Sequence, residues 1–113
     1  MILSHEKLDA YQVAIEFLTI AFALLEKLPR GHSALADQLR RASLSIPLNI
    51  AEAVGKTSRA DSARYFATAR GSALECAAIL DACAIMRLAS DEQRIKGKQL
   101  LTRAVSMLSK LCR

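Results

Sequence analysis

The chain has 113 residues, of which 52% are hydrophobic, 4% aromatic and 24% charged, with four Gly and two Pro. The apolar fraction excludes a disordered chain, and the few Gly and Pro argue against a β-sandwich or barrel, whose turns need them. The length suits one domain over residues 1–113 and excludes a large enzyme with a separate cofactor domain. A formal net charge of +5 favours an anionic partner without identifying one.

The first half of the chain predicts two helices, because its apolar residues recur at spacings of three and four. The first helix covers residues 5–28 and ends at a Pro-Arg-Gly sequence. The second covers residues 34–54, with Ser33 as its N-cap and Gly55 as its end. Pro47 lies inside the second helix and predicts a kink rather than a break, because the apolar spacing continues past it.

The second half predicts two more helices, each preceded by a serine that can cap it. The third covers residues 59–88 and begins after Ser58, and the fourth covers about 91–111. Ser90 and Gln93 form the pattern of a capping box in front of the fourth helix. Four helices joined by short connections predict an all-α, antiparallel, up-down-up-down four-helix bundle with a kinked second helix.

The first and third helices carry more apolar positions than one bundle core needs. In the third helix this surplus forms a second line of apolar residues, which consists of Ala67, Gly71, Leu74, Ala78, Ala82 and Ile85. Most of the residues in the two lines of this helix are Ala or Gly. We expect a second buried interface, most simply between copies of the chain; the alternative is a thick monomeric core.

Several short motifs in the middle of the chain resemble those of the 23S ribosomal RNA intervening-sequence protein family, also called the S23 family. The matching segments are QLRRA at 38–42, SIP at 45–47, NIAE at 49–52 and GSALE at 71–75. Departures such as Ala53, where the family usually has Gly, are mild. The resemblance covers nearly the whole chain.

This resemblance implies an antiparallel four-helix bundle assembled into a ring, typically a homopentamer. One relative, the accessory variability determinant of diversity-generating retroelements, is a basic pentamer that binds nucleic acid and a reverse transcriptase. Other members have no known activity. The resemblance therefore specifies the fold more strongly than the function.

Positive charge is concentrated in two segments of the chain. Residues 40–70 have a net charge of +4 and residues 94–113 one of +6, while the remaining segments are acidic. Cations on one helix face can meet phosphate oxygens without reading bases. The candidate nucleic-acid-binding residues are Arg40, Arg41, Lys56, Arg59, Arg64, Arg70, Lys96, Arg103 and Lys110. The alternative is a solvated face with cations favoured near helix C-termini.

Ser45, Asn49 and Glu52 lie on one side of the predicted second helix. Because buried polar groups need partners, we expect Glu52 to pair with Arg40, Arg41 or Arg64. We interpret the three as a structural polar network that fixes helix register; a polar pocket or a catalytic carboxylate is the alternative reading.

Catalysis and metal binding have little support in the sequence. It contains no Walker loop, nucleophile elbow or dinucleotide fingerprint, and no Glu-x-x-His pair of the di-iron bundle type. Cys76 and Cys83 are seven residues apart on one helix, too far for a disulfide. We therefore expect no enzymatic activity, no metal and no cofactor.

The sequence favours a cytoplasmic protein, because it has three cysteines, no secretory signal and no apolar segment long enough to span a bilayer. The favoured function is a non-enzymatic homo-oligomer that binds RNA or DNA without sequence preference through basic helix surfaces. The alternative is a scaffold ring for a partner protein, such as a reverse transcriptase, without nucleic-acid binding.

Overall fold

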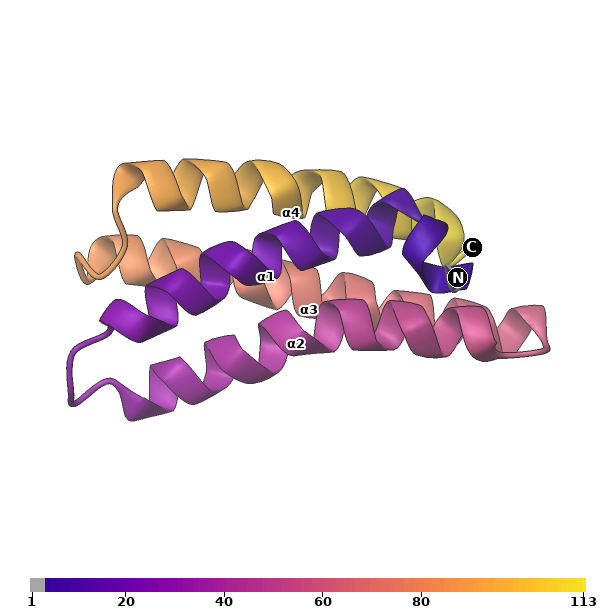
Figure 1. Ribbon diagram of the computed structural model, residues 1–113, viewed down its shortest axis with the longest axis horizontal. Coiled ribbons are helices and arrows are strands. Elements are labelled where there is room, and N and C mark those ends of the chain that lie inside the picture. The colour runs from indigo at the N-terminus through magenta and orange to yellow at the C-terminus, as the bar shows by residue number, and fades with distance from the viewer. Residues whose placement is uncertain (1–3) are drawn as a thin grey trace.

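Four antiparallel α-helices lie side by side in the computed structural model, which describes residues 4–113 without the side chains of residues 6 and 7 (Figure 1). The elements are the 3₁₀ helix η1 (Ser4–Lys7) and the α-helices α1 (Asp9–Lys27), α2 (Ser33–Gly55), α3 (Arg59–Ile85) and α4 (Asp91–Leu111). α1 and α3 each pack against both α2 and α4, so the helices form a square in cross-section. This arrangement confirms the predicted four-helix bundle, and assembly into a ring stays a prediction.

The first helix starts later than its apolar spacing predicts. α1 begins at Asp9 because the backbone of Leu8 is extended, with a ψ of 131°. No side chain caps this end of the helix. The preceding residues form η1 instead, and the ring of His5 meets that of Tyr11 edge-on with centroids 4.8 Å apart. The helical spacing of apolar residues therefore extends further toward the N-terminus than the α-helix itself.

The N-cap of α2 differs from the predicted one, and the helix continues without a break through Pro47. Ser33 is the first helical residue rather than the N-cap, which is His32 and makes no side-chain cap bond. Pro47 is buried inside an unbroken helix, and Figure 1 shows α2 changing direction along its course. Gly55 is the last helical residue, as predicted.

The two remaining N-terminal caps are confirmed. The hydroxyl of Ser58 accepts a hydrogen bond from the backbone of Asp61, and Ser90 and Gln93 form a complete capping box in front of α4. α3, however, ends at Ile85, three residues before the predicted end. It ends there because Arg87 has a φ of 59°, in the left-handed region that stops a helix.

The core is formed by one side of each helix. Its large, fully buried members include Phe17 of α1, Ile46 of α2, Leu80 of α3 and Leu101 of α4. In α1 the apolar residues Val13, Phe17 and Leu24 are buried. The surplus apolar residues of α1 lie partly outside the core, so that Ile15 is 39% exposed and Phe22 36%.

The surplus apolar line of α3 lies outside the core of a single chain. We call Ala67, Gly71, Leu74, Ala78 and Ile85 the outer stripe of α3. All five are exposed, with Leu74 at 46% and Ile85 at 84%. The buried residues of this helix lie on the opposite side and include Phe66, Ala73 and Leu80. One chain therefore leaves apolar surface on α3 uncovered.

Candidate functional site

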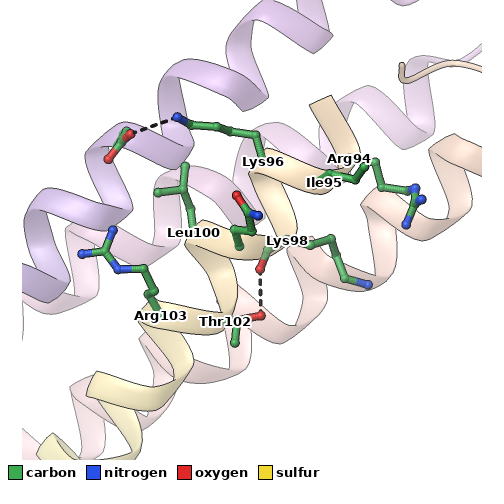
Figure 2. Close-up of a pocket in the computed structure, with 9 residues that line it drawn as sticks. Arg94, Ile95, Lys96, Lys98, Leu100, Thr102 and Arg103 are labelled. Carbon is green, nitrogen blue, oxygen red and sulfur yellow. Dashed lines mark hydrogen bonds and ion pairs between the residues drawn. The ribbon is translucent and has the colours of Figure 1, made fainter. Parts of the chain in front are cut away.

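An open groove of about 690 Å³ runs along the outer surface of α4, beside α1 (Figure 2). We call it the α4 groove, and its lining consists of Glu16, Arg94, Ile95, Lys96, Lys98, Gln99, Leu100, Thr102 and Arg103. Four of these nine side chains are cationic and one is anionic. The groove is therefore a strongly basic surface with an apolar floor.

The cations of the α4 groove point to two sides. Figure 2 shows Lys96 and Arg103 reaching toward α1, while Arg94 and Lys98 reach toward α3. Lys98 Nζ is held 2.8 Å from an Asp81 carboxylate oxygen, and Lys96 Nζ is 3.9 Å from one of Glu16. Within the described part of the chain, Arg94 and Arg103 have no acidic partner. Their guanidinium groups are the ones free to meet an external anion.

Helical periodicity explains why these cations share one side of α4. The buried line of α4, which includes Gly97, Leu101 and Leu108, faces the core. Lys96, Arg103 and Lys110 are offset from that line, recur every seven residues and are all exposed. At a rise of 1.5 Å per residue, neighbouring members of this series lie about 10.5 Å apart along the helix.

The cations at the turn between α2 and α3 form a separate group. Lys56 Nζ and Arg64 Cζ lie 4.8 Å and 5.0 Å from the ring centroid of Tyr65. Each also has an acidic neighbour: Lys56 lies 3.3 Å from Glu52 and Arg64 lies 3.5 Å from Asp61. Figure 1 shows this turn at the end of the bundle opposite the start of α4. Arg59, which is exposed, belongs to the same turn.

The three other predicted cations do not join the α4 groove. Arg40 pairs with Asp37 at 3.1 Å, and the Nε of Arg41 donates to the Asp37 carbonyl at 3.4 Å. Arg70 is half-buried, and its Nε donates to the hydroxyl of Ser109 at 2.7 Å, which ties α3 to α4. Arg70 therefore has a structural contact that the sequence did not reveal.

Sequence reasoning missed Arg94 as a member of the groove. It lies one turn before Lys98 on the α3 side of the series that starts at Lys96. The spacing of four residues between Arg94 and Lys98 was the signal that could have found it.

The expected polar network forms only in part. Asn49 Nδ2 donates to both the hydroxyl and the carbonyl of Ser45 at 2.8 Å, and Ser72 of α3 donates to the same hydroxyl at 2.8 Å. The expectation that Glu52 pairs with an arginine is wrong, because its ion pair is with Lys56. Lys56 lies four positions further along the chain, at the C-cap of α2, and so reaches Glu52 more easily than a residue on α3.

The cysteines of α3 are not poised for nucleophilic chemistry. Burial, with a smaller effect of the Glu75 carboxylate, raises the pKa of the Cys76 thiol to about 12, and burial also raises the pKa of Cys83. Such thiols stay protonated at neutral pH, and the thiolate is the reactive form. The side chains that the structure describes include no cluster of three His, Cys, Asp or Glu arranged to hold a metal ion.

These features define a small four-helix-bundle protein with a basic groove on the outside of a helix. No described helix combines the length and apolar character that a membrane crossing requires. The family model of the 23S rRNA-intervening sequence protein matches residues 6–110, and the chain belongs to this family.

A solved structure with the same fold supports the architecture. It is a protein with unknown function from the S23 ribosomal protein family of Bacteroides thetaiotaomicron, determined at 1.70 Å. It superposes with a TM-score of 0.84 at 23% identity, over 92% of this chain and 98% of that one. At this identity the likeness concerns the fold. Among curated proteins, no match to the chain was found.

Proposed function

We propose that the protein is a non-enzymatic, cytoplasmic homo-oligomer that binds nucleic acid through the α4 groove without reading its sequence. The supporting observation is that Arg94 and Arg103 have no acidic partner in the described chain. Two further cations, Lys96 and Lys98, line the same groove. An exposed cation without a carboxylate partner gains from meeting a phosphate. The segment that carries the groove, residues 94–113, contains no acidic residue.

Binding of this kind is driven by the release of counterions from the nucleic acid. The logarithm of the binding constant then falls linearly with the logarithm of the salt concentration, by about 0.9 per phosphate neutralised on a duplex. Contacts of Arg94, Lys96, Arg103 and Lys110 would give a slope between about −3 and −4. Base composition would change the affinity little, because phosphate contacts carry no sequence information.

Fluorescence anisotropy with labelled RNA and DNA at low salt tests the proposal. The double variant Arg103→Glu/Lys110→Glu is expected to bind at least about tenfold more weakly, since it replaces two cations by anions. The matched control Lys27→Glu/Arg30→Glu makes the same change of charge at the end of α1 and is expected to bind within about twofold of wild type. No detectable binding at tens of micromolar protein, or equal losses in both variants, would overturn the proposal.

The proposal that the protein is a homo-oligomer is based on the outer stripe of α3. Burying its exposed apolar area against a second copy would contribute about 25 cal/mol for each Å² removed from water. Family resemblance suggests a homopentamer, five times the chain mass of 12.3 kDa.

Light scattering at micromolar concentration tests the assembly. Leu74→Glu should reduce the measured mass, whereas Thr68→Glu, an exposed α3 position outside the stripe, should leave it unchanged. A wild-type mass near 12.3 kDa contradicts the assembly.

The second candidate is a scaffold ring for a partner protein, a reverse transcriptase being one option. The outer stripe also supports this function, because an uncovered apolar helix face suits another protein as well as a second copy. Pull-down from the native host separates the two candidates. Protein partners that survive high salt support the scaffold, whereas nucleic acid lost at high salt supports the α4 groove.

A further inference from the structure

A second, smaller cleft of about 380 Å³ lies between α2 and α3. We call it the α2–α3 cleft, and its lining consists of Gln38, Arg41, Ala42, Ser45, Ser72 and Glu75. It shares no residue with the α4 groove. All six residues come from the motif segments at 38–42, 45–47 and 71–75, which belong to two different helices and meet here.

The floor of the cleft is a chain of hydrogen bonds. The Ser45 hydroxyl accepts from Ser72 of α3 and from the Asn49 amide, both at 2.8 Å. These bonds fix the positions of two hydroxyl groups where α2 meets α3. Ser45 keeps its hydroxyl hydrogen to donate, and Ser72 keeps its oxygen lone pairs to accept. Each can therefore bind a ligand without losing much side-chain entropy.

The walls of the cleft carry one charge of each sign. Arg41 stands on α2, and only its Nε is engaged, with the Asp37 carbonyl at 3.4 Å. Glu75 stands on α3 and makes no hydrogen bond or ion pair with any group that the structure describes. The two line the same cleft without forming an ion pair with each other. A cation and an anion thus line the same cleft, and each has groups that are free to form hydrogen bonds with a ligand.

We propose that the α2–α3 cleft binds the zwitterionic head group of a free α-amino acid. The ligand carboxylate meets the terminal nitrogens of Arg41, whose planar fork matches a carboxylate. The ligand ammonium meets the Glu75 carboxylate, and the Ser45 and Ser72 hydroxyls complete the hydrogen bonds. A volume of about 380 Å³ is within the range of small-molecule sites. This ligand uses both charged walls, whereas a simple anion would leave Glu75 repelling it.

Two-dimensional amide NMR of the full chain tests the proposal with free glycine as the probe. Glycine is expected to shift the Ser45, Ser72 and Glu75 amide signals saturably at millimolar concentration, since an open site with few contacts binds weakly. Acetate and methylammonium, at matched ionic strength, each carry half of the charge pattern and are expected to bind about tenfold more weakly.

Variants at the two walls make the test specific to the cleft. Arg41→Gln and Glu75→Gln should each weaken glycine binding about tenfold, while Arg40→Gln, which lies outside the cleft and pairs with Asp37, should change it less than twofold. Thermal unfolding checks that all three variants fold.

Four results would overturn the proposal. They are acetate binding as tightly as glycine, an equal effect of Arg40→Gln, no saturable shift up to about 50 mM glycine, and no loss in either wall variant. None of them depends on whether the α4 groove binds nucleic acid, because the two sites share no residue.

Discussion

A Cβ atom added at Gly97 would lie 2.7 Å from Cδ1 of Leu80, so α4 approaches α3 closely at this residue. Leu80 is fully buried, and Phe17 closes the same space with its Cε1 at 3.4 Å from the added atom. Both side chains are buried, so a Cβ at this position would require Leu80 to shift within the core. The glycine therefore allows α4 to lie close to Leu80 and Phe17.

Gly97→Ala is expected to lower the free energy of unfolding by about 1 kcal/mol. Overpacking costs about 1–3 kcal/mol, and the better helix propensity of alanine returns about 1 kcal/mol. Urea denaturation measures the difference. Gly55→Ala is the matched control: Gly55 is the last residue of α2, is exposed and has nothing within 4 Å, so the added methyl should leave the chain unchanged or slightly more stable. Equal stabilisation by both variants would contradict the close packing.

Arg87→Gly is expected to stabilise the protein by about 0.5–1 kcal/mol. Arg87 occupies the left-handed region with a φ of 59°, and the Leu88 amide behind it bonds to the Cys83 carbonyl at 2.8 Å, which completes a Schellman motif. Glycine adopts this conformation without the steric cost that a Cβ brings.

Thermal and urea unfolding measure the Arg87→Gly effect against Arg103→Gly. The control also removes an exposed arginine but places glycine inside α4, where it should cost about 1 kcal/mol. Destabilisation by both variants would show that the turn does not need the left-handed conformation.

How far the sequence predicts the fold depends on the range of the interaction. Ser58 and Ser90 cap helices through groups three residues away, and both starts were predicted correctly. The end of α3 was not, because the rule for helix ends looks for Gly or Asn and this chain uses Arg87. The late start of α1 likewise depends on the extended backbone of Leu8, which the apolar pattern does not predict.

In the candidate site, too, features set by residues close in sequence could be predicted, whereas contacts between helices could not. The series Lys96, Arg103 and Lys110 could be predicted because a seven-residue repeat keeps one face along any helix. Contacts between helices could not: Arg70 bonds to Ser109, 39 residues away in sequence. The surplus apolar line of α3 was visible as a pattern, yet only the packed bundle shows which of its two lines is uncovered.

Arg70→Ala is expected to destabilise the protein by about 1–2 kcal/mol. It removes a 2.7 Å hydrogen bond from a cation to the Ser109 hydroxyl, together with the packing of a half-buried side chain. Arg40→Ala is the control, because its exposed pair with Asp37 should contribute less than about 0.5 kcal/mol.

Urea denaturation gives both values, and Ser109→Ala should reproduce part of the Arg70→Ala loss. Measured under conditions where both chains are folded, nucleic-acid affinity should be within about twofold of wild type in Arg70→Ala. A large loss of affinity in a stable Arg70→Ala variant would instead place this arginine in the binding surface.

The stability of the protein is expected to fall between pH 9 and about 12, in part because of Cys76. Burial raises the pKa of this thiol from 9.0 to about 12, so the folded state holds the proton where the unfolded state releases it. Because the folded pKa is the higher one, this contribution is complete below pH 9 and is lost as the pH rises toward 12. The slope that one thiol adds is at most about 1.4 kcal/mol per pH unit.

Denaturation curves of wild type and Cys76→Ala across this pH range isolate the effect, because the two proteins differ only in this side chain. Cys76→Ala should be less stable than wild type at neutral pH, since it leaves a cavity in the core, and its stability should fall less steeply above pH 9. Parallel curves for wild type and Cys76→Ala would show that the Cys76 thiol loses its proton equally easily in the folded and unfolded chain.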